Sequence, residues 1–310
     1  MSSVLEPTVR TLFKCCLSGM LWLIGCCAHA QVLFACEPEW AALAKVLMPQ
    51  AKMHIATAHT QDPHHIEARP ALIAQLRSAD MALCTGAALE EDWLPVLQQK
   101  SGNPKVQNGQ PGLFWATDGQ DLLGRTTSTG SPFEGDVHPH GNPHVHANPQ
   151  RLLQVARAMG ERMTTLWPDQ AGAIQDRLRG FEQRWQSNLS RWQGQAQSLR
   201  GKTVAAQHTY FTYWWEWLGV SPVADLEPKP GLTPSPAHLQ KVLQQLRAAP
   251  TRVRGLAMAG HQDPRAAKWM QQQLGWLTVW TWNGTTALAT EEGLVQWFDG
   301  MLADMNKAGS

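Results

Sequence analysis

Short apolar runs alternate with amphipathic stretches along most of the chain. In the first half, the pattern predicts a series of strands and helices at Val32–Cys36, Pro38 onward, Met53–Ala58, Pro70–Arg77 and Met81–Thr85. In the helix that begins near Pro38, Trp40, Leu43 and Leu47 fall on one face. Strands that alternate with helices in this way are typical of βαβ units, which build a parallel sheet.

The middle of the chain has a different period. Apolar residues recur there at spacings of three or four: Ile174, Leu178, Phe181, Trp185, Leu189 and Trp192. This spacing predicts one long amphipathic helix from Pro168 to Leu199, with proline in its first turn and Gly201 beyond its end. At about 1.5 Å per residue it would be roughly 45 Å long, enough to connect two lobes.

The strand and helix alternation then resumes. The predicted elements are Thr203–Gln207, a helix around Tyr210–Leu218, Pro236–Ala248, Val253–Met258, Pro264–Leu274, Thr278–Trp282 and Glu291–Met305. We therefore expect an α/β fold of two lobes, each with a small parallel sheet flanked by helices, joined by one long rigid helix. The expected division is a leader at 1–30, an N-terminal lobe at 31–165, the connecting helix at 166–200 and a C-terminal lobe at 201–310.

The N-terminal segment indicates export. Arg10 and Lys14 precede an apolar stretch that is too short for a comfortable membrane span, and Ala28-His29-Ala30 offers a signal-peptidase site before Gln31. A second interpretation is that Leu23-Ile24-Gly25-Cys26 is a lipobox with a lipidated Cys26; we favour simple cleavage. The expected location is periplasmic.

Composition narrows the classes of function. With 310 residues, 43% hydrophobic and 16% charged, the chain can bury two cores and is not disordered. Cleavage of the leader removes Glu6, Arg10 and Lys14, which takes the formal charge from +1 to 0. This charge favours neither a nucleic-acid nor an anionic-membrane partner, and we expect a monomer.

Two cysteines remain after the leader, Cys36 and Cys84, and each ends a predicted strand. If the two strands are neighbours in a parallel sheet, both cysteines lie at the same edge. An exported protein meets oxidising conditions, so we predict a disulfide between them. Two small buried hydrophobic residues are the alternative.

Histidines supply the candidate chemistry. The segment 136–149 contains His138, His140, His144 and His146, and other histidines stand upstream in Asp62-Pro63-His64-His65 and downstream at His208. Imidazole is a common zinc ligand, and a tetrahedral site needs three or four such groups from separate segments. The competing interpretation is a solvated polar loop.

These residues resemble the metal-specific solute-binding proteins of bacterial ABC importers, the zinc and manganese group with ZnuA-like members. That family carries a DPH element, here Asp62-Pro63-His64, and an element of the form DPHxWxDP, here Asn142-Pro143-His144-Val145-His146-Ala147-Asn148-Pro149. It also has a histidine that closes the first strand of the C-terminal lobe, here His208. The resemblance implies that His64, His144 and His208 bind the metal in a cleft between the lobes.

The fourth ligand departs from the family pattern. Family members usually supply an aspartate or glutamate from a late C-terminal loop, but the corresponding segments read Ala259-Gly260-His261-Gln262-Asp263 and Asn283-Gly284-Thr285-Thr286. Water, His261 or Asp263 could take the position, and Glu291 is more distant. We interpret His138 and His140 as solvated loop residues rather than auxiliary metal collectors, and the role of His146 stays open.

Three imidazoles without an obvious set of carboxylates favour Zn²⁺ over manganese, while copper and nickel stay open. The expected function is a non-enzymatic periplasmic protein that captures zinc and delivers it to an ABC permease in the inner membrane. A secreted zinc hydrolase is one alternative, although the chain has no HExxH motif and its nearest acid is Glu67. A periplasmic zinc metallochaperone is the second alternative, and it would use the same site. Periplasmic metallochaperones are also candidate partners besides the permease.

Overall fold

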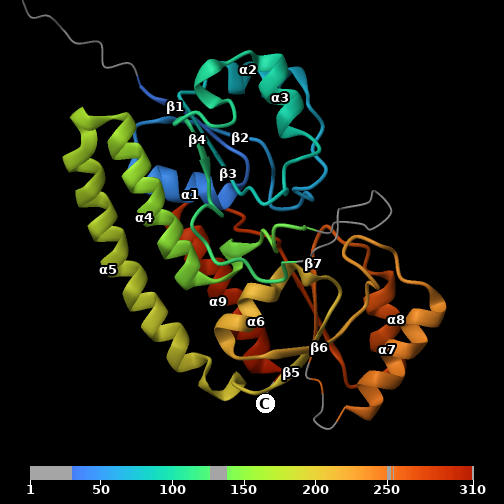
Figure 1. Cartoon of the computed structure of the whole chain (residues 1–310). Coiled ribbons are helices and arrows are strands. Elements are labelled where there is room, and N and C mark those ends of the chain that lie inside the picture. The colour runs from blue at the N-terminus through green and yellow to red at the C-terminus, as the bar shows by residue number, and fades with distance from the viewer. Residues whose placement is uncertain (1–29, 126–137, 250–252, 254, 309–310) are drawn as a thin grey trace, which may run out of the picture. The chain divides into compact units, whose positions relative to one another are not determined.

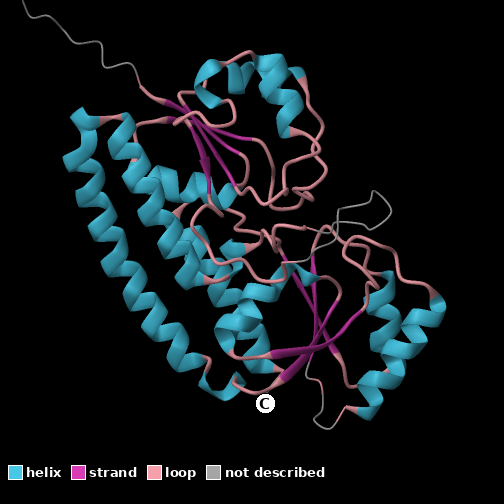
Figure 2. Cartoon of the chain, in the orientation of Figure 1, coloured by secondary structure: helices cyan, strands magenta, loops and turns pink. Residues whose placement is uncertain are grey.

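Two parallel sheets of four strands each form the framework of the described residues (Figures 1 and 2). The computed structural model describes residues 30–125, 138–249, 253 and 255–308. The predicted leader, with Cys26 and the cleavage site before Gln31, lies outside these residues apart from Ala30. Among the described residues, no helix is long and apolar enough to cross a membrane.

The first sheet has the strand order β2-β1-β3-β4, and all neighbours are parallel. Its strands are β1 (Val32–Ala35), β2 (Lys52–Ile55), β3 (Met81–Cys84) and β4 (Leu113–Trp115). Its helices are α1 (Pro38–Leu47), α2 (Pro70–Arg77) and α3 (Leu94–Ser101), followed by a 3-10 turn at Pro104–Val106. Side chains of a strand alternate between faces, so Leu33 packs with the α1 core and Phe34 with the α2 and α3 core.

The second sheet repeats this topology in the order β6-β5-β7-β8. Its strands are β5 (Thr203–Ala206), β6 (Ser221–Asp225), β7 (Gly255–Ala259) and β8 (Thr278–Trp282). The helices that accompany it are α6 (Thr212–Leu218), α7 (Pro236–Ala248), α8 (Arg265–Gln273) and α9 (Glu291–Lys307). The predicted α/β fold with two parallel sheets and a long helix between them is confirmed.

Two helices connect the sheets. The helix α4 (Pro149–Leu166) lies alongside α5 (Ala171–Gln195), as Figure 1 shows. The helical pattern predicted α5 correctly in its core, but the α-helix is shorter than expected, because 3-10 turns take up Pro168–Gln170 and Gln197–Leu199. Its 25 residues span roughly 37 Å.

One hydrophobic core runs along α5 through both lobes. Trp185 and Trp192 of α5 contact Phe298 of α9, and α1 of the first lobe also contacts both helices. The same core cluster includes Leu33 of β1 and Trp282 of β8. Because the lobes share this core, wide separation would expose aromatic surface, which favours small tilts over open hinge motion.

Some elements were not predicted. Helix α3 and strands β4 and β6 lacked clear signals: β4 has only three residues, and β6 begins Ser221-Pro222 at a sheet edge, where a proline is tolerated. Strand β2 starts one residue earlier than expected and ends at Ile55. The predicted residue boundaries of the lobes stay a prediction.

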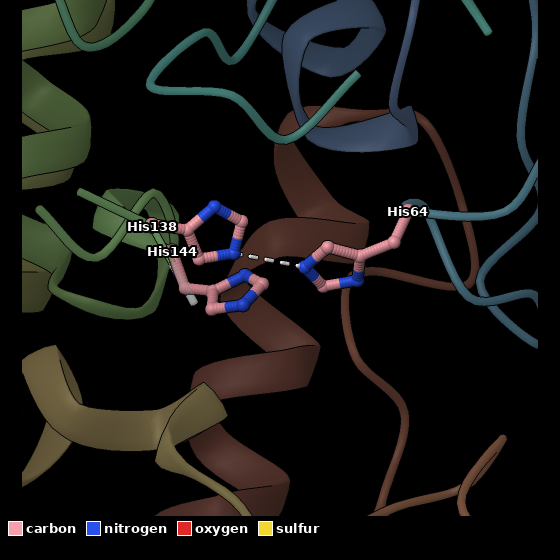
Figure 3. Close-up of side chains that lie close together, drawn as sticks. All are labelled: His64, His138 and His144. Carbon is pink, nitrogen blue, oxygen red and sulfur yellow. Dashed lines mark hydrogen bonds between the residues drawn. The ribbon is translucent and has the colours of Figure 1, made fainter. Parts of the chain in front are cut away.

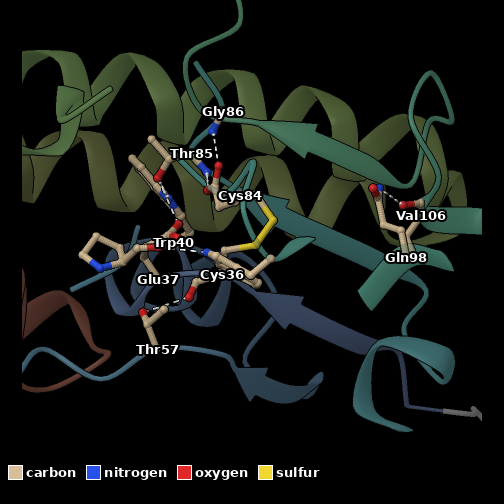
Figure 4. Close-up of a disulfide and its surroundings, with 12 residues drawn as sticks. Cys36, Glu37, Trp40, Thr57, Cys84, Thr85, Gly86, Gln98 and Val106 are labelled. Atoms are coloured by element: carbon tan, nitrogen blue, oxygen red, sulfur yellow. Dashed lines mark hydrogen bonds between the residues drawn. A yellow bond between two sulfur atoms is a disulfide. The ribbon is translucent and has the colours of Figure 1, made fainter. Parts of the chain in front are cut away.

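The predicted disulfide is present. Strands β1 and β3 are parallel neighbours, and Cys36 and Cys84 leave them at the same edge with a Cα–Cα distance of 4.8 Å (Figure 4). The bridge spans 48 residues of sequence. It therefore fixes the strand ends from which the loops after β1 and β3 depart.

Two buried carboxyl groups lie next to the disulfide. Glu90 accepts the backbone N–H groups of Thr85 and Gly86 at 2.5 and 3.0 Å. Glu37 accepts the Thr85 hydroxyl at 2.9 Å (Figure 4). Burial, and then the charge of Glu90, raise the pKa of Glu37 well above its usual value. Burial also raises the pKa of Glu90, to about 7. The pair therefore holds at least one proton near neutral pH.

Replacing both cysteines by serine should lower the free energy of unfolding by about 2–4 kcal/mol, because the unfolded chain regains the entropy of a long loop. Denaturant titration of the double variant against the oxidised protein measures this. An unchanged midpoint would contradict a stabilising role for the bridge.

The buried acids predict a pH dependence of stability. Both folded-state pKa values are raised, so between about pH 4.5 and 7 the folded state binds more protons than the unfolded state, and stability falls as pH rises. The variant Glu37→Gln should flatten this decline in melting temperature between pH 5 and 7.5. Glu91→Gln, at an exposed neighbour, is the control. Equal slopes in both variants would show that the pair does not titrate as described.

Candidate metal centre

The three predicted metal ligands lie near one another, but among the described residues only His64 and His144 of the three offer ring nitrogens within 4.8 Å of each other. His64 lies in the loop after β2, His144 precedes the 3-10 turn Val145–Ala147 that leads into α4, and His208 follows β5. The ring centres of His64 and His144 are 5.6 Å apart, and those of His144 and His208 are 6.3 Å apart. All three side chains are buried. The loops at the carboxyl ends of the parallel strands thus meet, as expected for ligand sites in α/β folds.

His64 is oriented by its neighbour Asp62. The Asp62 carboxylate accepts the backbone N–H of His64 at 3.1 Å and contacts its ring Nδ1 at 2.6 Å. Burial by itself raises the pKa of Asp62, but the hydrogen bonds from His64 outweigh burial and hold that pKa well below its usual value. A charged carboxylate at Nδ1 places the ring proton there, so Nε2 carries the free lone pair.

His208 is held in the same way. Its Nδ1 lies 2.7 Å from Oε2 of Glu227, which follows β6 and also accepts the backbone N–H of Gly231 at 2.8 Å. The carboxylate again leaves Nε2 free. Carboxylate-held histidines of this kind recur in zinc sites, where the carboxylate fixes the tautomer and raises the basicity of the ligand. No local pattern of the sequence indicates the orienting role of Glu227, because it is 19 residues from His208.

His144 has no partner for either ring nitrogen among the described residues. Tyr210 stacks on its ring with a centroid distance of 3.9 Å, and Asn142 holds its backbone N–H at 2.9 Å. Burial, together with nearby imidazoles such as His64, lowers the pKa of His144 well below its usual value. An unsatisfied buried polar atom costs about 1–3 kcal/mol, so this arrangement is costly unless a ligand completes it.

The prediction that His138 is a solvated loop residue is wrong. Its Nε2 lies 3.1 Å from Nε2 of His64, and the two rings stack with centres 5.2 Å apart (Figure 3). Each of His64, His138 and His144 offers a ring nitrogen within 4.8 Å of the others. Burial, and then the charges of His64 and His208, lower the pKa of His138 to about 3. His140, by contrast, is exposed as predicted.

His146 has a structural role. Its Nε2 lies 3.0 Å from the carbonyl oxygen of Gly284, and its Nδ1 lies 3.3 Å from Oε1 of Glu39. The Thr285 hydroxyl donates to the other oxygen of Glu39 at 2.6 Å. These buried contacts engage the loop after β8, which is where the family resemblance led us to expect an acidic ligand.

The candidate fourth ligands differ in position. His261 lines the site cavity, and its Nδ1 is buried without a partner among the described residues. The Asp263 carboxylate instead accepts the backbone and side-chain N–H groups of Arg265. Glu291 starts α9 and pairs with Arg184 at 2.7 and 2.8 Å. Both acids are therefore engaged by arginines.

A cavity of about 500 Å³ opens on the site from the side of the second sheet. It is lined by side chains of both lobes, among them Asp62, His64, His208, Tyr210, Glu227 and His261. Two of the predicted ligands, His64 and His208, thus line the space through which an ion would enter.

The chain is similar to known proteins over most of its length. The family model described as zinc-uptake complex component A periplasmic, ZnuA, matches residues 34–308. The high-affinity zinc uptake system protein ZnuA of Yersinia pestis is 25% identical over 195 residues, which are 59% of this chain and 61% of that protein. The zinc-binding lipoprotein AdcA of Streptococcus pneumoniae is 22% identical over 73% of this chain and 46% of its own length.

The chain therefore spans about three fifths of the first relative and less than half of the second. A crystal structure of ZnuA has the same fold, with a TM-score of 0.75 at 14% identity, covering 91% of this chain and 100% of that one. The matched region contains both sheets, apart from the first two residues of β1, and every histidine described above. The chain belongs to the family of periplasmic zinc-uptake complex component A proteins.

Proposed function

We propose that this protein is a periplasmic solute-binding protein that captures Zn²⁺ with His64, His144 and His208 and delivers it to an ABC permease in the inner membrane. The observation that carries the proposal is the pairing of two carboxylate-held imidazoles with a third buried imidazole that has no protein partner. A protein that only needed a stable core would not bury three such rings together, because each buried nitrogen without a partner loses its hydrogen bond to water.

The donor set favours zinc. Imidazole nitrogens suit zinc, copper and nickel, whereas manganese prefers carboxylate, carbonyl and water oxygens. Here the nearest carboxylates, Asp62 and Glu227, are engaged at the Nδ1 atoms of histidines. The relatives, a zinc uptake system protein and a zinc-binding lipoprotein, support the same cargo. Export into the periplasm rests on the leader sequence and on the description of the family.

The site does not favour a zinc hydrolase. Such an enzyme needs a carboxylate or similar base beside the metal-bound water. Glu67 is exposed and is not among the residues that line the cavity, and both nearby carboxylates already hold ligand histidines. A metallochaperone would use the same ligands and would differ only in its partner.

Zinc titration of the mature protein in competition with a chromophoric chelator tests the proposal. We expect one tightly bound zinc per chain, and at least about tenfold weaker binding after replacement of His64, His144 or His208 by alanine. The control is His65→Ala, at an exposed neighbour that lies 3.7 Å from Asp92. Undiminished affinity in the His208 variant would remove it from the ligand set.

The same preparation distinguishes a binding protein from an enzyme. We expect no hydrolysis of esters, peptides or phosphoesters above a chelator-treated control. Metal-dependent turnover that disappears in the His64→Ala variant would contradict the proposed function and would identify the protein as a zinc hydrolase.

The orienting carboxylates should contribute through their histidines. Asp62→Asn leaves the His64 ring in place but removes the negative charge at Nδ1, so zinc affinity should fall by about 10–100-fold. Asp92→Asn, beside the exposed His65, is the matched control and should leave affinity unchanged. Equal affinities in these two variants would show that Asp62 shapes the loop without tuning the ligand.

A further inference from the structure

We propose that His138 is the fourth zinc ligand, in place of the carboxylate that the C-terminal loop lacks. This inference rests on the proposed zinc-binding function and adds a donor to the same site. His138 belongs to the segment that leads from the first sheet into α4. Three of the four ligands, His64, His138 and His144, would then precede α5, and His208 would be the single ligand from the second sheet.

His64 and His138 lie close enough to bind one metal ion together. His64 and His138 approach through their Nε2 atoms at 3.1 Å. For two imidazoles on one tetrahedral zinc with Zn–N bonds of about 2.0–2.1 Å, the nitrogens are roughly 3.3 Å apart and the ring centres roughly 5 Å apart. The observed ring-centre distances of 5.2 Å between His64 and His138 and 5.6 Å between His64 and His144 are close to this geometry.

The contacts around the two rings leave their Nε2 atoms facing each other. Nδ1 of His64 is directed at Asp62, and the ring of His138 forms a hydrogen bond with the backbone of Ala87. Nε2 of His64 then faces Nε2 of His138 at 3.1 Å, and a cation bound by both nitrogens would stabilise this pair.

The backbone that meets His138 is unusual. Ala87 and Ala88 have φ values of +51° and +69°, a left-handed conformation that residues other than glycine rarely adopt. Strain of this kind persists only where surrounding contacts impose it, and it concentrates at functional sites. Here Glu90 anchors the turn through the N–H groups of Thr85 and Gly86, and the turn brings Ala87 to the ring of His138.

The loop after β8 explains why a replacement donor is needed. In this chain it reads Asn283-Gly284-Thr285-Thr286, and its Gly284 carbonyl and Thr285 hydroxyl contact His146 and Glu39. It offers no carboxylate to the metal. A fourth imidazole completes an all-nitrogen sphere, which strengthens the preference for zinc over manganese.

The experiment compares His138→Ala with His140→Ala, whose side chain is exposed two residues away. Zinc competition titration should show about tenfold or greater loss of affinity for His138→Ala and none for His140→Ala. X-ray absorption of the zinc-loaded proteins should show the outer-shell scattering of four imidazole rings in the wild type and of three in His138→Ala.

Two outcomes would overturn the assignment while leaving the proposed function intact. In one, His138→Ala and His140→Ala bind zinc equally well while His208→Ala is weakened. In the other, His138→Ala binds zinc more tightly than the wild type, which would mean that His138 competes with the ion for His64. A wild-type protein that fails to bind zinc would instead overturn the proposed function.

Discussion

The site depends on one constraint, which is the hydrogen-bonding capacity of a buried imidazole ring. Each neutral ring has one donor and one acceptor, and neither can be left without a partner in the interior at low cost. Asp62 and Glu227 contact Nδ1 of His64 and His208, which leaves the Nε2 acceptor of each ring for another partner. His144 has no partner for either nitrogen among the described residues, and Tyr210 covers its face. The folded chain thus carries a cost that a cation with affinity for nitrogen can remove.

The surrounding fold holds these rings in place. The disulfide between Cys36 and Cys84 fixes two strand ends, and the core along α5 packs aromatic residues of both lobes into one cluster. Close to the site, Glu39 bridges His146 of the first lobe and Thr285 of the second in a fully buried contact. A shared core and a buried polar bridge both oppose wide opening, so under the proposed function we expect metal exchange to use small displacements of loops at the strand ends.

The pattern of the sequence was sufficient for much of this description. Strand and helix alternation predicted both sheets, and the stripe from Ile174 to Trp192 predicted α5. His64, His144 and His208 were predicted as ligands from the motifs that resemble the family, and their role stays a prediction. Two strands were not predicted, because β4 is too short for a periodic signal and β6 contains Pro222. The prediction for His138 was wrong because it lies in a polar segment whose composition is that of a solvated loop.

The sequence by itself determined the local periodicities, the pairing of two cysteines at strand ends, and which histidines are candidate metal ligands. Only the tertiary structure decided which groups meet: Glu227 with His208, His138 with His64, and Glu39 with the loop after β8. The reason is that these contacts join segments 19, 74 and 246 residues apart. Local patterns record which face of an element is apolar, whereas long-range polar contacts depend on how the sheets and their loops pack in space.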